Sequence, residues 1–146
     1  MWSKIDSESD IIDFMRIVDD LSDSCIKEIK YVSGGYVSEN LGMHAVNTKR
    51  NLYIYIQSQY SKISAIELLF KGVKKFYMLP RDEQHDCVIY DSSIIKHQNL
   101  FYWADYGDLD INNVDKSGTF VEAEHMYWRS IDFGLGEADV YANCMK

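Results

Sequence analysis

Proline, cysteine and long apolar runs are scarce in this sequence. Of its 146 residues, one is proline and three are cysteine, namely Cys25, Cys87 and Cys144. An odd number of widely spaced cysteines is not the pattern of a disulfide framework. No apolar run approaches the roughly 20 residues of a membrane-spanning helix, and the first residues lack the apolar core of a secretion signal. We therefore expect a cytoplasmic protein with reduced thiols and no membrane partner.

Positive charge is scarce as well. The chain carries 15 Lys and Arg against 23 Asp and Glu, which gives a formal net charge of -8 at pH 7. Nucleic-acid binding normally needs a basic patch, and the nearest approach to one is formed by Lys71, Lys74, Lys75 and Arg81. We therefore expect no nucleic-acid partner. A basic protein is the kind of partner that this charge would attract.

The composition is otherwise that of a globular protein rich in aromatic residues. Hydrophobic residues make up 47%, charged residues 26% and aromatic residues 14% of the chain. At this length a chain can bury a substantial core without disulfides or metals. We expect one domain over residues 1–146, because no linker, repeat or low-complexity segment interrupts the sequence.

The N-terminal part has the pattern of an amphipathic helix over residues 7–22. Ser7 and Asp10 have the spacing of a capping box at the start of this segment. Apolar residues then recur at helical spacing, at Ile11, Phe14, Met15, Val18 and Leu21. Acidic residues crowd its C-terminal end, where the helix dipole disfavours them, so packing rather than propensity should hold this helix.

Strand patterns follow the helix. They cover residues 25–32, 52–57, 66–71, 76–79, 87–90, 100–104 and 120–131. Gly34-Gly35 reads as a hairpin turn and Gly72 as a bulge or turn. The connections are too short for the crossovers of parallel strands. The predicted fold class is α+β, with the helix packed on a mostly antiparallel, curved sheet of six to seven strands or a partial barrel.

The acidic segment 105–115 only partly matches a calcium-binding loop. Asp108, Asp110 and Asn112 have alternating oxygen ligands, but Asn113 stands where such a loop needs glycine and Thr119 where it needs glutamate. A polar surface loop is the interpretation that fits, and no metal site is predicted. Gly34-Gly35 and Gly134-Leu135-Gly136 do not have the spacing of phosphate-binding loops, so no cofactor is predicted either.

Two residue groups leave a hydrolase open as an alternative. Cys87 with His85 could supply a nucleophile and a base, if the fold brings them together in an electropositive setting. Glu122 and Glu124 share one face of a predicted strand and could divide acid and base roles. No substrate-binding motif accompanies either pair, and we assign no catalytic residue.

The aromatic residues on the strands point to recognition instead. If Leu52, Ile54 and Ile56 fill the core, Tyr53 and Tyr55 form part of the opposite face. Tyrosine and tryptophan are favoured at interfaces, where an apolar ring meets a polar edge. The predicted binding residues are exposed aromatic residues beside acids. They are Tyr53, Tyr55, Trp103, Asp105, Tyr106 and Asp108.

Several stretches carry a family resemblance. Residues 23–29, 66–73 and 99–104, together with the later Tyr127-Trp128-Arg129, resemble small uncharacterised bacterial proteins that share a domain of unknown function. The resemblance covers most of residues 10–136, rests on strand patterns and implies no catalytic residue. In size, acidity and predicted fold class the chain is also similar to bacterial immunity proteins, which neutralise basic nuclease toxins.

The leading hypothesis is a non-enzymatic protein-interaction module, in which acidic charge steers a partner toward aromatic anchors. Charge reversal at Asp105 and Asp108 should then slow partner association. A small-molecule-binding protein with an aromatic-lined cleft is the alternative, and a small hydrolase a weaker one. A homo-oligomer that pairs its aromatic sheet face with a second copy also stays open.

Overall fold

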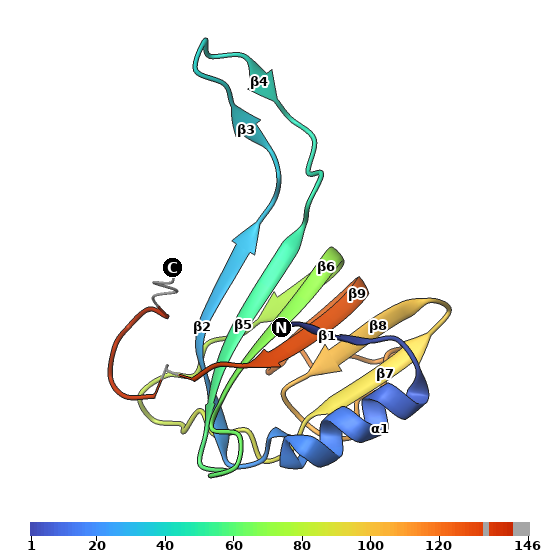
Figure 1. Cartoon of the computed structure of the whole chain (residues 1–146), viewed down its shortest axis with the longest axis vertical. Helices are drawn as coiled ribbons and strands as arrows, with labels where there is room; N and C mark the ends of the chain where they lie inside the picture. Colours follow the sequence, from blue (N-terminus) through green and yellow to red (C-terminus); the bar gives the residue numbers. More distant parts are fainter. Residues whose placement is uncertain (133–134, 142–146) are drawn as a thin grey trace.

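The computed structural model describes residues 1–132 and 135–141, which form one α-helix, one short 3-10 helix and nine strands (Figure 1). Gly134 and Cys144 lie outside the described residues. The elements are β1 (Ser3–Ile5), α1 (Glu8–Ile17), the 3-10 helix η1 (Asp19–Leu21), β2 (Ser24–Val32), β3 (Tyr36–Val37), β4 (Met43–His44), β5 (Asn51–Ser58), β6 (Ala65–Met78), β7 (Ser93–His97), β8 (Leu100–Ala104) and β9 (Thr119–Ser130).

Seven strands form one open sheet in the order β2-β5-β6-β9-β8-β7, and β1 adds to β9. Every strand pair in it is antiparallel, which confirms the antiparallel prediction. β8 pairs with residues 120–123 of β9 and β1 with residues 126–128, so these two strands share one edge of β9. The sheet is not closed into a barrel. The fold fits the α+β class.

The main apolar cluster lies on one face of the sheet, and a smaller cluster around Tyr102 and Phe120 lies on the other face. Leu52, Ile54 and Ile56 alternate onto the main-cluster face of β5, as the sequence predicts, and each is at most 1% exposed. On α1, Ile11 and Phe14 are buried in the same cluster, and the Phe14 ring lies 5.0 Å from that of Trp128 on β9. The burial of apolar surface between α1 and the strands is the main favourable term for this part of the fold.

The helix is shorter than predicted. The capping box between Ser7 and Asp10 is present, but α1 ends at Ile17 rather than near residue 22. Asp19, Asp20 and Leu21 all have positive φ angles, so the chain reverses there in a left-handed turn. Acidic side chains are unfavourable in the last turn of a helix, which explains why α1 does not continue through Asp19 and Asp20. The left-handed turn also brings Leu21 into the core immediately before β2 begins. Here packing and local charge override the apolar periodicity.

Other predicted boundaries are also wrong. Segment 87–90 is not a strand, since only Ile89 forms an isolated bridge with Ser24. Segments 66–71 and 76–79 belong to one long strand, β6. β7 was not predicted, although Gln98 and Asn99, both with positive φ, form the tight turn that joins it to β8.

Gly34-Gly35 is not a hairpin turn. Gly34, with a φ of +97°, lies at the base of a longer hairpin, where a Cβ would come within 2.6 Å of the Lys49 nitrogen. The chain turns at residues 38–42 instead. We call residues 33–50 the β3–β4 arm. Figure 1 shows it projecting from the sheet at the end opposite to α1.

Gly72 is a position within β6 where the backbone is left-handed. Its φ is +65°, and a Cβ at this position would lie 2.8 Å from the side-chain carboxyl carbon of Glu124 on β9. Lys71 and Val73, on either side of Gly72, pair with β9 in one register, and the register shifts only beyond them, between Val73 and Lys75. The irregularity therefore follows the glycine at which a bulge was predicted, and the alternative of a turn is wrong because β6 continues through Gly72. Glycine is required here because the backbone is left-handed and because a Cβ would clash with the Glu124 side chain.

We expect Gly72→Ala to lower the free energy of unfolding by about 1–3 kcal/mol, because the new Cβ meets both a left-handed backbone and the Glu124 side chain. Urea denaturation would measure the change. Gly35→Ala is the matched control, since a Cβ there has no neighbour nearer than 3.4 Å and Gly35 does not have a left-handed φ. Equal stability of the two variants would contradict this role of Gly72.

Candidate functional site

The six predicted binding residues do not form one surface. Trp103 is fully buried, and its ring lies 6.2 Å from that of Phe70 in the core. The prediction that Trp103 is an exposed anchor is therefore wrong. The physical reason is the alternation of β8, which directs Phe101 and Trp103 to the core face, while Tyr53 and Tyr55 lie on the opposite face of the sheet.

Tyr55 is also buried, but on the face opposite the core. It stands in register with Glu67 on β6, which in turn stands opposite Arg129 on β9. The Arg129 Nε donates a hydrogen bond of 2.7 Å to Glu67, a carboxylate that is itself 2% exposed. The Tyr141 ring lies 4.7 Å from the Tyr55 ring. A buried charge needs such a partner, so the Arg129 guanidinium compensates the burial of the Glu67 carboxylate beside Tyr55.

Burial raises the pKa of Tyr55, and hydrogen bonding with Glu67 and the negative charge of that carboxylate raise it further. The phenol therefore keeps its proton well above the usual range. The expectation that Tyr55 is an exposed binding residue is wrong, because it lies beside the Glu67–Arg129 pair and the Tyr141 ring packs against it.

Tyr53 is half-buried on the same face and is flanked by a cation. The Lys30 Nζ lies 4.8 Å from the centre of the Tyr53 ring, and on the same face the Lys71 Nζ lies 5.1 Å from the Tyr127 ring. Tyr53 therefore has a lysine beside it, whereas acids were expected there. It keeps enough accessible surface to contribute to recognition.

Two of the predicted residues, Asp105 and Tyr106, accept hydrogen bonds that order the acidic loop. Asp105 is half-buried, and its Oδ1 accepts a hydrogen bond of 2.9 Å from the Thr119 nitrogen. The Tyr106 hydroxyl accepts one of 3.1 Å from the Asp115 nitrogen, and its ring packs on a second apolar cluster. Asp108 is exposed and has a left-handed backbone. Asp105 and Tyr106 thus order the loop, and Asp108 presents free charge to solvent.

The two glutamates of the hydrolase hypothesis have separate surroundings. Glu124 lies over Gly72 and forms ion pairs with Arg50 at 3.8 Å and Lys74 at 3.7 Å. Glu122 lines a surface hollow with Tyr77, Phe120 and neighbouring polar side chains. This hollow is the nearest match to the expected aromatic-lined cleft, but it contains none of the six predicted binding residues.

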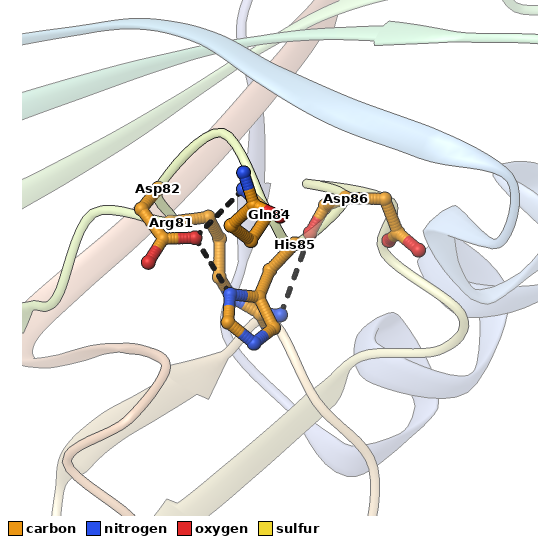
Figure 2. A network of polar contacts seen from close by, with 5 residues as sticks. All are labelled: Arg81, Asp82, Gln84, His85 and Asp86. Carbon is orange, nitrogen blue, oxygen red and sulfur yellow. Dashed lines mark hydrogen bonds and ion pairs between the residues drawn. The ribbon is translucent and has the colours of Figure 1, made fainter.

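The segment around His85 forms a local network in an exposed connection between β6 and β7 (Figure 2). The His85 Nδ1 and the Asp82 Oδ1 are 2.6 Å apart, and the hydrogen bond from His85 is the main cause that lowers the pKa of Asp82. Arg81 donates to the Asp86 carbonyl at 3.4 Å. The Cys87 thiol is instead the neighbour of Cys25. His85 is thus engaged with a carboxylate and stabilises its own loop.

Within residues 1–132 and 135–141, no group of three or more His, Cys, Asp or Glu side chains is placed to hold a metal ion. The same part of the chain contains no helix with the length and apolar character to cross a bilayer.

The β3–β4 arm is an apolar surface that the sequence patterns did not indicate. Five large apolar side chains of this arm are exposed, and they are Tyr36, Val37, Leu41, Met43 and Val46. At the tip, Leu41 is 83% exposed and has a φ of +68°. A leucine at this position is unfavourable for two reasons. Large non-glycine residues rarely adopt a left-handed backbone, and a large apolar side chain is normally buried rather than exposed to water.

The arm is anchored at its base rather than along its length. The nitrogens of Lys49 and Arg50 both donate to the Ser33 carbonyl at 3.0 Å. Farther out, Tyr36 stacks on His44 with ring centres 4.4 Å apart. A two-stranded hairpin that packs on no other element is marginally stable in water. The turn residues Asn40 and Gly42 around Leu41 were the sequence signal for the tip.

Comparison of the chain with protein-family models, with curated proteins and with solved structures finds no match in any of the three.

As the pH rises above about 10, the free energy of unfolding should fall less steeply in the Tyr55→Phe variant than in the wild-type protein. Because the pKa of Tyr55 is raised by folding, the unfolded chain loses this proton first, once the pH exceeds about 10. The unfolded state then binds fewer protons than the folded state, so the free energy of unfolding falls by about 1.4 kcal/mol per pH unit for one such group.

Urea denaturation over a series of alkaline pH values would measure this slope in the wild-type protein and in Tyr55→Phe. Tyr53→Phe is the control, because it removes the same hydroxyl from the same strand at a half-buried position. An alkaline slope that is the same in the wild type and in Tyr55→Phe would refute the assignment.

Proposed function

We propose that this chain is a non-enzymatic protein-interaction module that holds its partner with the β3–β4 arm. The observation that carries the proposal is the exposed, left-handed Leu41 at the tip of a projecting hairpin with four further exposed apolar side chains. Exposed apolar surface of this kind marks protein–protein contact sites. Burial against a partner would remove it from water and would stabilise a hairpin that has little support of its own.

The charge distribution favours a basic protein as the partner. The arm contains Glu39 as its single acidic residue, whereas the chain as a whole carries a net charge of -8. The acidic body would therefore steer a basic partner during approach, while the apolar arm supplies the contact that keeps it bound. Neutralisation of a basic toxin, the function of immunity proteins, is one form that this interaction would take.

The predicted anchors change accordingly. Leu41, Met43 and Val46 on the arm replace Trp103 and Tyr55 as apolar anchors, since the latter two are buried. Tyr53, which keeps accessible surface, and the exposed Asp108 stay in the proposal as peripheral contacts. Contacts at a rim contribute mainly to association rate and salt dependence, whereas central apolar anchors contribute most of the affinity.

The Leu41→Asn variant tests the arm. Asparagine tolerates the left-handed backbone better than leucine, so the turn should be kept or improved while the apolar anchor is lost. We expect the protein captured by the wild-type chain from lysate of its native host to bind the variant at least about tenfold more weakly. Biolayer interferometry with the captured partner would measure both affinities.

Ile12→Ala is the matched control, because Ile12 is also an exposed apolar residue, 61% exposed, but lies on α1. The proposal predicts wild-type affinity for this control. It fails if Leu41→Asn binds as tightly as the wild type, if both variants lose affinity equally, or if the wild-type chain captures only small molecules or a second copy of itself.

Steering by the acidic loop can be tested separately with the double variant Asp108→Asn and Asp110→Asn. Both side chains are exposed, and asparagine keeps the oxygen of Asp110 that accepts a hydrogen bond from the Asn112 nitrogen. Stopped-flow association at low salt should slow by roughly two- to fivefold, and the difference should shrink as salt is added. An unchanged association rate at low salt would exclude this loop from steering.

A further inference from the structure

Two cysteines far apart in the sequence are neighbours in the structure. Cys25 follows the first residue of β2, and Cys87 lies in the connection between β6 and β7. The two segments meet at the antiparallel bridge between Ser24 and Ile89, where the Ile89 nitrogen donates to the Ser24 carbonyl at 2.7 Å. Each cysteine is therefore one or two residues from a backbone hydrogen bond that ties the segments together.

The bridge also brings the two cysteines to the same side of it. Cys25 is one residue beyond the bridged Ser24, and Cys87 is two residues before the bridged Ile89, so in the antiparallel arrangement both lie in the same direction from the bridge. Paired residues of antiparallel strands have Cα atoms about 4.5–5.5 Å apart. A disulfide spans Cα separations of about 4.4–6.8 Å, which includes this spacing.

Side-chain surroundings agree with this placement. Cys25 and Val88 line one surface hollow, and Cys87 and Val88 line another with Ile26, so Val88 adjoins both cysteines. The thiols are close enough to interact: burial is the main cause that raises the pKa of Cys25, and the charge and hydrogen bonding of Cys87 raise it further. Cys87 is exposed and Cys25 is half-buried, and both are free.

We propose that Cys25 and Cys87 form an oxidisable dithiol that hydrogen peroxide converts to an intramolecular disulfide. The exposed Cys87 thiolate attacks one peroxide oxygen, the O–O bond breaks, and hydroxide leaves, which gives a sulfenic acid on Cys87. The Cys25 sulfur then attacks the Cys87 sulfur, the S–O bond breaks, and water leaves. Overall two thiols lose two protons and two electrons, and one peroxide is reduced to two molecules of water.

The disulfide would connect β2 to the exposed segment that carries the His85 network. In the reduced chain this connection is tied to β2 by the Ser24–Ile89 bridge and is otherwise irregular. Closing a covalent loop from Cys25 to Cys87 restricts the unfolded chain and should raise the unfolding temperature of the oxidised protein. The site is independent of the β3–β4 arm, so it does not depend on the proposed function.

The full chain carrying Cys144→Ser tests the pair, because only Cys25 and Cys87 then remain. After treatment with hydrogen peroxide, we expect the loss of both free thiols in an Ellman titration. Intact mass should fall by the mass of two hydrogens, and peptide mapping should recover a Cys25–Cys87 cross-link that dithiothreitol reverses. Adding Cys25→Ser should abolish the cross-link and leave the sulfenic acid on Cys87 open to trapping by dimedone.

Three outcomes would overturn the proposal: two free thiols after oxidation, oxidation of Cys87 to sulfinic or sulfonic acid while Cys25 stays reduced, or disulfides only between separate chains. Circular dichroism of the reduced variants checks that each substitution leaves the fold intact. Should Cys25→Ser fail to fold, Cys87→Ser tests the cross-link instead, because substitution of an exposed side chain is tolerated and this variant should form no intramolecular disulfide.

Discussion

The antiparallel pairing of β6 with β9 is the interaction on which the rest of the structure depends. It runs along nearly the whole of both strands, and the free edge of β9 then receives β8 and β1. The pairing sets Glu67 opposite Arg129 and lets Glu124 lie over Gly72. It also fixes the base of the β3–β4 arm, because Arg50 exchanges hydrogen bonds with Val73 and forms an ion pair with Glu124. A projecting arm can present side chains to a partner only if its base is held, and this strand pair holds it.

In this account the acidic surface and the arm contribute to different stages of recognition. Charge acts over a distance and speeds the encounter, whereas exposed apolar side chains act only in contact and hold the complex together. The half-buried and buried groups on the face opposite the core, such as Tyr55 and Glu67, support the sheet beneath. On a projecting hairpin, exposed apolar side chains are held away from the protein's own core and stay available for contact with a partner.

The sequence predicted the features that rest on strong local patterns. Alternation correctly assigned Leu52, Ile54 and Ile56 to the core, and the spacing of Ser7 and Asp10 correctly identified the helix cap. It failed where tertiary packing decides. The two faces of β8 look alike in sequence, so nothing local indicated that Trp103 would be buried, and Asp105 was taken for surface charge because its bond to Thr119 depends on the loop closing. The β3–β4 arm was missed because its apolar residues follow no alternation, and periodic alternation is the signal by which a strand is recognised in a sequence.

The most direct test of the central claim is hydrogen–deuterium exchange of the chain with and without its captured partner. Amides that are opened easily in the free protein exchange fast, and a hairpin with few supporting contacts should be among them. The account predicts that partner binding slows exchange most strongly within residues 33–50. Protection confined to the sheet face around Tyr53 and Tyr127, with exchange in the arm unchanged, would contradict it.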